Sequence, residues 1–212
     1  TTVADNLAVF HHGQHVVRHE NLLPDTAYTE HGIDFRTLPR PEGQLLSVLA
    51  TVNDVHFGET ECGRIDDSPL GPIQFSRPGE RPYPITMNAG AIAEIKKLNP
   101  NAVLVKGDLT EGGTDEQFAA FREHYEGAFA DKLFVVRGNH DAYRGQNVFT
   151  GDQWIQLPGV AIGLIDTAIP RETTGRIDPP QFEWLNDQLS ASTTPVIIMG
   201  HHQQWTEGKR SD

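Results

Sequence analysis

The chain has 212 residues and a net charge of −12, so it is long enough for one sizeable core and too acidic for a general binder of nucleic acids or anionic membranes. No apolar run approaches the ~20 residues of a membrane-spanning helix, so we expect no membrane-inserted part. The single cysteine, Cys62, excludes an internal disulfide and leaves the cellular compartment undecided. Because the first residue is Thr1 and not Met, we interpret the chain as a processed or trimmed product.

Residues 1–43 predict a short β-meander that ends in a Pro- and Gly-rich linker. Its strands are expected at 7–10, 15–17 and 33–37, with a turn at Gly13 between the first two. The Leu-Pro-x-Thr-x-Tyr pattern at 23–28 resembles the late strands of fibronectin-type sandwich domains, where a Tyr pins the connection between strands. The segment is too short for a whole domain of that kind, so we interpret it as a remnant.

Residues 44–212 predict a second domain in which strands and helices alternate. The expected strands are 45–53, 102–106, 132–136, 160–165 and 195–199. The expected helices are 86–98, one that begins at the capping box of Thr114 and Gln117, and one that begins after Asp178 with a Pro at its first position. Residues 57–85 are rich in Gly, Pro and charge, so we expect a long loop there. This alternation predicts parallel strand pairing with crossover helices.

Potential metal ligands follow four of the expected strands, at the point where each strand ends. They are Asp54 and His56, then Asp108, then Asn139, and finally His201 or His202. Ligands of open α/β sheets bind beyond the carboxyl ends of the strands, so these side chains are expected to converge. A mixture of carboxylate, amide oxygen and imidazole favours Mn, Fe, Zn or Mg over Cu(I) or an iron–sulfur cluster.

The spacing of these residues indicates how they would act. Side chains two apart in an extended segment point the same way, so Asp54 and His56 are expected to reach one cation together. The Asp108 carboxylate has two oxygens and can bridge two cations, which would hold a bridging hydroxide for attack on phosphorus. We assign His140 to the leaving-group oxygen as acid or hydrogen-bond donor, and Asp141 to the orientation of His140.

Together these motifs resemble the calcineurin-like metallophosphoesterase superfamily. The resemblance covers Ser47 to His202 and is closest to the bacterial branch that hydrolyses cyclic nucleotides and other phosphodiesters. It implies an αββα sandwich, a binuclear metal centre and hydrolysis of phosphoesters. It also implies the ligand sets, namely Asp54, His56 and Asp108 for one metal and Asp108, Asn139 and His201 for the other.

One feature of that superfamily has no counterpart in this sequence. The family pattern ends with a Gly-His-x-His motif that gives one more His to each metal, and no such motif follows His202. We therefore expect the C-terminal part of the fold and the remaining ligands to come from a second polypeptide segment or a partner chain.

Three functions remain open at this point. The first is a metal-dependent phosphodiesterase or phosphatase that acts on a small phosphoester. The second is a non-catalytic binding or scaffold protein of the same fold, which the absent last motif would explain. The third is a nuclease, which the acidic composition and the lack of a basic stripe disfavour.

Overall fold

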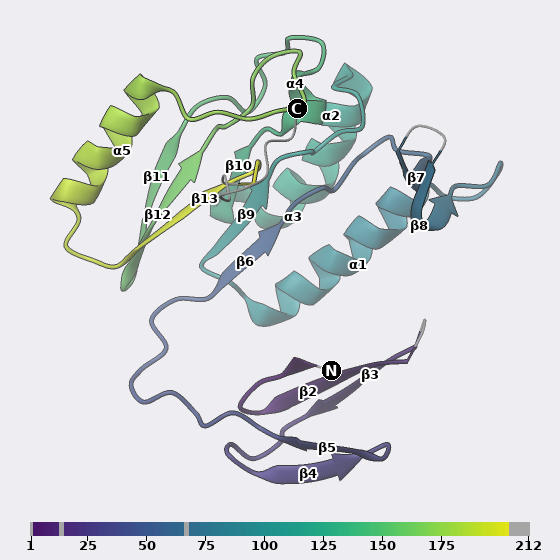
Figure 1. Ribbon diagram of the computed structural model, residues 1–212, viewed down its shortest axis with the longest axis vertical. Coiled ribbons are helices and arrows are strands. Elements are labelled where there is room, and N and C mark those ends of the chain that lie inside the picture. The colour runs from purple at the N-terminus through teal and green to yellow at the C-terminus, as the bar shows by residue number, and fades with distance from the viewer. Residues whose placement is uncertain (1, 13–14, 66–67, 204–212) are drawn as a thin grey trace. The chain divides into compact units, whose positions relative to one another are not determined.

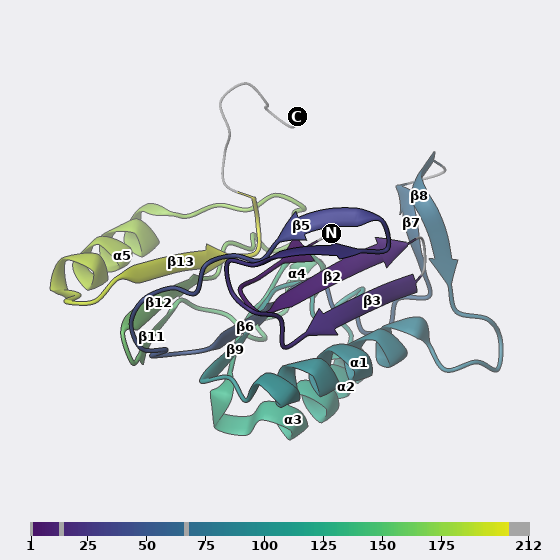
Figure 2. The same ribbon diagram turned by 90° about the horizontal axis from the view of Figure 1, so that it is seen from below.

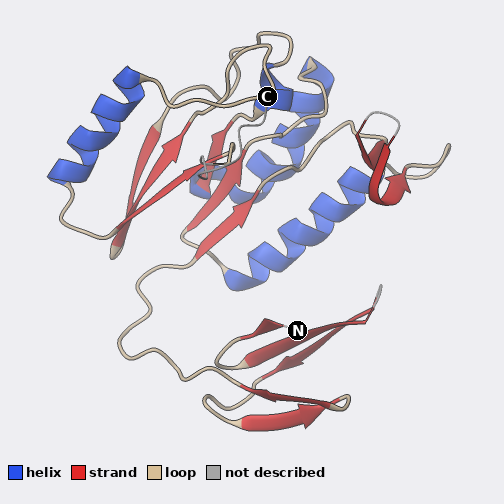
Figure 3. Ribbon diagram, viewed as in Figure 1, coloured by secondary structure: helices blue, strands red, loops and turns tan. Residues whose placement is uncertain are grey.

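The computed structural model describes residues 2–12, 15–65 and 68–203, so the predicted turn residue Gly13 lies outside the described residues. The chain divides into two compact units, Thr1–Leu45 and Leu46–Asp212. Figure 1 shows the elements of both units, and Figure 3 separates helices from strands by colour.

The N-terminal unit consists of antiparallel strands. β1 (Thr2–Val3), β2 (Leu7–His12) and β3 (His15–Glu20) form one sheet, and β4 (Ala27–Glu30) pairs with β5 (Ile33–Arg36). The hydroxyl of Tyr28 accepts a hydrogen bond from the Leu23 amide at 2.8 Å. This bond ties the segment before β4 to the strand itself, in the way that the sequence pattern predicted.

The first sheet of the larger unit is parallel, with the order β10-β9-β6. Its strands are β6 (Leu49–Val52), β9 (Ala102–Lys106) and β10 (Leu133–Val136). One face of this sheet packs against α1 (Tyr83–Leu98), α2 (Asp115–Phe121) and α3 (Gly127–Phe129), with a π-helical turn at Arg122–Glu126 between the last two. Val103 and Val105 point into this layer, and the intervening Leu104 points to the opposite face.

The second sheet has the order β11-β12-β13 and faces the first. Its strands are β11 (Gln153–Leu157), β12 (Val160–Ile165) and β13 (Val196–Gly200), and only the β12–β13 pair is parallel. A core cluster that includes Leu104, Ile155 and Ile162 fills the space between the sheets. α5 (Pro179–Ala191) lies along the outer side of the second sheet, where Trp184 meets Trp154 (Figures 1 and 2). These layers confirm the predicted αββα sandwich.

Local sequence signals explain where the helices begin and end. Thr114 and Gln117 form the predicted capping box at the start of α2, and Asp178 and Gln181 form another at the start of α5. Helix α1 ends at Leu98 and is followed by Asn99, whose left-handed backbone (φ 43°) lets the chain leave the helix axis.

Several expectations about the elements of the larger unit were wrong. The first strand begins at Leu49 and not at residue 45, and α1 begins at Tyr83, one residue after Pro82, and not at residue 86. The segment expected as a long loop contains an antiparallel hairpin, β7 (Glu61–Ile65) and β8 (Ser68–Phe75). Strand β11 was not predicted, because its five residues include two glutamines and too short an apolar run.

Among the described helices, none has the length and apolar character needed to cross a membrane.

Candidate metal centre

The loops that follow β6 and β9 run side by side beyond the ends of the strands. The Asp54 amide donates to the Gly107 carbonyl at 3.1 Å, and the His56 amide donates to the Asp108 carbonyl at 3.0 Å. Three of these residues have left-handed backbones, with φ values of 55° for Asp54, 43° for His56 and 49° for Asp108. Non-glycine residues adopt this region at a cost, and such strain concentrates at functional sites.

This backbone brings together the predicted ligands of the first metal. His56 Nε2 lies 3.6 Å from Asp108 Oδ2 and 4.0 Å from Asp54 Oδ1. The side chains therefore meet as expected, but the predicted cause of their convergence, an extended backbone, was wrong. Asp54 and His56 do not belong to an extended segment, and their side chains converge because both residues turn through left-handed conformations.

The Asp108 carboxylate lies between two groups of ligands. Its Oδ2 faces His56, whereas its Oδ1 lies 3.3 Å from His201 Nε2 and accepts the His140 amide at 3.0 Å. His201 Nε2 in turn lies 3.1 Å from Asn139 Oδ1. Asp108 is 5% exposed and each of its oxygens serves one group, which is the arrangement that a bridging ligand requires.

The donor set fits metal ions, because hydrogen-bond acceptors face one another in it. His201 Nδ1 lies 2.9 Å from the Lys106 carbonyl, so Nδ1 carries the ring proton and Nε2 of the neutral ring presents a lone pair to Asn139 Oδ1 and Asp108 Oδ1. A pair of acceptors repels unless a cation or a proton lies between them. Neighbouring donor atoms bound at about 2.1 Å to one cation are roughly 3 Å apart, which is the spacing found here.

The pKa values of Asp108 and His201 are shifted in the directions that their close contact predicts. Burial raises the pKa of Asp108, but the hydrogen bond and charge of His201 and the amide of His140 bring it below its ordinary value. Burial lowers the pKa of His201, and Asp108 more than compensates, so the His201 pKa is raised. Both shifts reflect the short contact between His201 Nε2 and Asp108 Oδ1.

His140 lies beside this group, at the start of the short helix α4 (Asn139–Ala142). Its Nδ1 contacts the Glu111 carbonyl oxygen at 2.7 Å, and its ring meets the His56 ring with the centroids 4.7 Å apart. The Glu111 carboxylate lies 2.9 Å from His56 Nδ1. Glu111 thus contacts both histidines. Each contact uses Nδ1 of the ring, so Nε2 of each ring remains available for another partner.

Asp141 does not orient His140, and that prediction was wrong. The Asp141 side chain is fully buried and accepts hydrogen bonds from the amides of Gly138, Leu109 and Thr110 and from the Thr110 hydroxyl, at 2.7–3.0 Å. Burial raises the pKa of Asp141, and these hydrogen bonds oppose that effect. Asp141 therefore ties the loop after β9 to the loop after β10.

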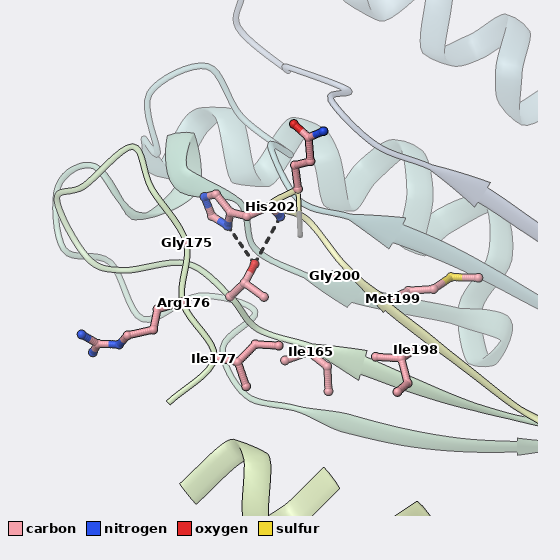
Figure 4. Close-up of a pocket in the computed structure, with 10 residues that line it drawn as sticks. Ile165, Gly175, Arg176, Ile177, Ile198, Met199, Gly200 and His202 are labelled. Atoms are coloured by element: carbon pink, nitrogen blue, oxygen red, sulfur yellow. Dashed lines mark hydrogen bonds between the residues drawn. The ribbon is translucent and has the colours of Figure 1, made fainter. Parts of the chain in front are cut away.

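His202 turns away from the metal ligands. Its Nδ1 lies 2.7 Å from the Thr167 hydroxyl, and it lines a pocket of about 300 Å³ beside β13, together with Ile165, Ile177 and Ile198 (Figure 4). Of the two neighbouring histidines, His201 is therefore the one placed among the predicted ligands.

Two residues of the site were missed by sequence reasoning. Glu111 lies three residues after Asp108, and Tyr143 lies one helical turn after Asn139, with its hydroxyl 2.8 Å from Asn139 Nδ2. The spacing of Tyr143 from Asn139 was the available signal, since residues four apart on a helix share a face.

Comparison with known proteins places this geometry in a family. The sequence pattern of the calcineurin-like phosphoesterase family matches residues 48–212. A "Probable cyclic nucleotide phosphodiesterase" of Synechococcus sp. is 27% identical over 120 residues, which make up 54% of this chain and 47% of that protein. A "cAMP/cGMP dual specificity phosphodiesterase" of Mycobacterium tuberculosis is 26% identical over 117 residues, which make up 50% of this chain and 37% of that protein.

A solved structure gives independent support for the fold. The crystal structure of a dimetal phosphatase from Danio rerio superposes with a TM-score of 0.55 and 12% sequence identity, covering 72% of this chain and 68% of that one. The chain spans about half or less of the length of the two bacterial relatives. Their names confirm the predicted similarity to bacterial phosphodiesterases. Since the family pattern covers most of its residues, the chain belongs to the calcineurin-like phosphoesterase family.

Proposed function

We propose that the protein hydrolyses small phosphodiesters with the help of two metal ions. The observation that carries the proposal is the meeting of five potential ligands from four strand ends. They are Asp54, His56, Asp108, Asn139 and His201. Family membership supports metal-dependent hydrolysis of phosphoesters, and the names of the bacterial relatives support phosphodiesters as the substrate class.

In this proposal each residue has a defined task. Asp54 and His56 would hold one ion, Asn139 and His201 would hold the other, and Asp108 would contribute to both. When bound, the ions supply a deprotonated water for attack on phosphorus and neutralise charge on the phosphoryl oxygens. His140 presents Nε2 to the leaving-group oxygen, because its Nδ1 is engaged by the Glu111 carbonyl.

The charge of the chain supports a small substrate over a nucleic acid. A net charge of −12 repels a long polyanion, whereas a single phosphodiester needs only local positive charge at the metal ions. The alternative of a non-catalytic scaffold gains no support from the site. A scaffold does not need His140 next to potential ligands whose backbones are strained.

We further propose that another polypeptide segment extends the second sheet at β13 and supplies the ligands missing from this sequence. Among the described residues, β13 pairs with β12 alone, and Ile197 and Ile198 are 40% and 38% exposed. Hydrogen exchange of the full-length protein tests this: slow exchange of the β13 amides that face away from β12 supports a paired edge, and fast exchange contradicts it.

A hydrolysis assay tests the catalytic proposal. We expect the full-length protein with Mn²⁺ to cleave bis-p-nitrophenyl phosphate faster than p-nitrophenyl phosphate, and Asn139→Ala to lose most of that rate. Equal rates for the wild type and Asn139→Ala would contradict the metal-dependent mechanism. A preference for the monoester would leave the metal centre standing and contradict the substrate class.

A further inference from the structure

The side-chain amide of Asn139 has a neighbour on each side. Its Oδ1 faces His201 Nε2 at 3.1 Å, and its Nδ2 donates to the Tyr143 hydroxyl at 2.8 Å. Tyr143 follows the last residue of α4, one helical turn after Asn139, so its side chain lies over the same face. The amide nitrogen is therefore hydrogen-bonded to a tyrosine, and the amide oxygen faces another predicted metal ligand.

This orientation decides whether Asn139 can bind a metal. Only Oδ1 carries lone pairs for a cation, whereas the two hydrogens on Nδ2 would repel one. An amide whose oxygen binds metal must place its Nδ2–H groups elsewhere, and a partly buried site offers few acceptors. The Tyr143 hydroxyl is the acceptor that the structure provides.

The tyrosine ring makes a separate contact. Its centroid lies 4.6 Å from that of His140, with the two planes inclined at 46°. The hydroxyl and the ring thus serve two different residues of the site. A phenylalanine at position 143 would keep the ring against His140 and remove only the acceptor for Asn139.

We propose that Tyr143 is a positioning residue that fixes the Asn139 amide with its oxygen toward the second metal ion. The inference rests on the proposed function, because it gives Asn139 the role of a metal ligand. Groups that orient metal ligands typically change metal affinity or activity 10–100-fold when they are removed, and we expect a loss of about that size.

Calorimetric titration with Mn²⁺ tests the inference in the full-length protein after metal is removed with a chelator. We expect two binding events in the wild type. In Tyr143→Phe, one event should weaken about 10–100-fold and the other should stay within twofold. Because Phe keeps the ring beside His140, a saturating concentration of Mn²⁺ should restore the hydrolysis rate.

Tyr125→Phe is the matched control. The Tyr125 hydroxyl donates to Asn88 Oδ1 at 2.7 Å, so this variant also loses a Tyr–Asn hydrogen bond, but in the core. It should lower the stability and leave both Mn²⁺ affinities unchanged.

The outcomes separate this inference from the proposed function. Two unchanged binding events in Tyr143→Phe would overturn the positioning role alone, and so would a rate loss that saturating Mn²⁺ does not restore. Equal weakening of both events would also overturn it, because it indicates a general disturbance of the site. A wild type that binds no Mn²⁺ would overturn the proposed function and this inference together.

Discussion

Replacement of Gly107 by alanine perturbs the centre through a single added carbon. Gly107 precedes the bridging Asp108 and has a φ of +83°, in the region that favours glycine. An added Cβ would lie 2.5 Å from Cγ, 2.6 Å from Nδ1 and 2.7 Å from Cβ of His201. The substitution therefore strains the backbone and also displaces a predicted metal ligand.

The magnitude follows from these two effects. A left-handed backbone costs an alanine about 1–2 kcal/mol relative to glycine. The His201 side chain must move by about 1 Å to reach ordinary contact, and forcing a group into a packed site costs about 1–3 kcal/mol. We expect the free energy of unfolding to fall by about 2–5 kcal/mol. The same movement takes His201 away from the Lys106 carbonyl and from Asn139, so Mn²⁺ affinity should fall as well.

Urea unfolding and Mn²⁺ titration of Gly107→Ala and Gly90→Ala measure both effects. Gly90 is exposed within α1 and has no atom within 4 Å of an added Cβ, so Gly90→Ala should stabilise the protein by about 0.5–1 kcal/mol without changing metal affinity. If Gly107→Ala matches Gly90→Ala in stability and metal affinity, His201 does not pack against the backbone as described.

Three further perturbations have defined outcomes. Thr114→Ala removes the acceptor for the Gln117 amide and should cost about 1 kcal/mol in a thermal melt, whereas an unchanged melt would contradict the capping box. Arg137→Ala leaves the buried Asp166 carboxylate without its main partner and should cost about 3–5 kcal/mol in urea unfolding; a cost below ~1 kcal/mol would show that the pair is dispensable. Removal of metal with EDTA should abolish hydrolysis and lower the unfolding midpoint. Mn²⁺ at ~100 times the Kd of a site should restore about 2.7 kcal/mol for that site, and a metal-insensitive midpoint would argue against the centre.

In the larger unit, the strands that were predicted share an apolar run, and those that were missed lack one. Residues 102–106 are buried on both faces of the sheet and are apolar up to Lys106, so their assignment as a strand was correct. Strand β11 has two glutamines among its five residues and lies at a sheet edge, and the β7–β8 hairpin contains glycines and prolines that usually break strands. The apolar run of a buried strand is a property of the sequence, whereas pairing at an edge depends on the neighbouring strand.

The same distinction applies to the site. The residue types and their order at the strand ends predicted which ligands would meet, because parallel strands end at the same edge. The left-handed backbones of Asp54 and His56 were not predictable, since the cost is compensated by hydrogen bonds to the loop after β9. Glu111 and Tyr143 were missed because their roles depend on contacts with side chains from other segments or from a short helix.

Asp141 shows how a residue within a catalytic motif can act through the backbone. Its two oxygens each accept two hydrogen bonds, Oδ2 from the Gly138 and Leu109 amides and Oδ1 from the amide and hydroxyl of Thr110. An asparagine in either orientation would place an NH₂ group against two of these donors. Hydrogen bonds to charged groups contribute about 1.5–3 kcal/mol each, so the loss of two of them in Asp141→Asn should destabilise the protein by roughly 3–6 kcal/mol.

Asp141→Asn should also affect metal binding, because Asp141 fixes the loop that carries Asp108 relative to the loop that carries Asn139. We expect Asp141→Asn to weaken both Mn²⁺ binding events, in contrast to the single event affected by Tyr143→Phe. The pH dependence of hydrolysis by the remaining metal-loaded enzyme should keep its wild-type shape, because His140 Nδ1 contacts the Glu111 carbonyl, whereas the Asp141 hydrogen bonds go to the loop backbone and Thr110. A shifted pH profile with normal stability would restore Asp141 to the catalytic role that the sequence first suggested.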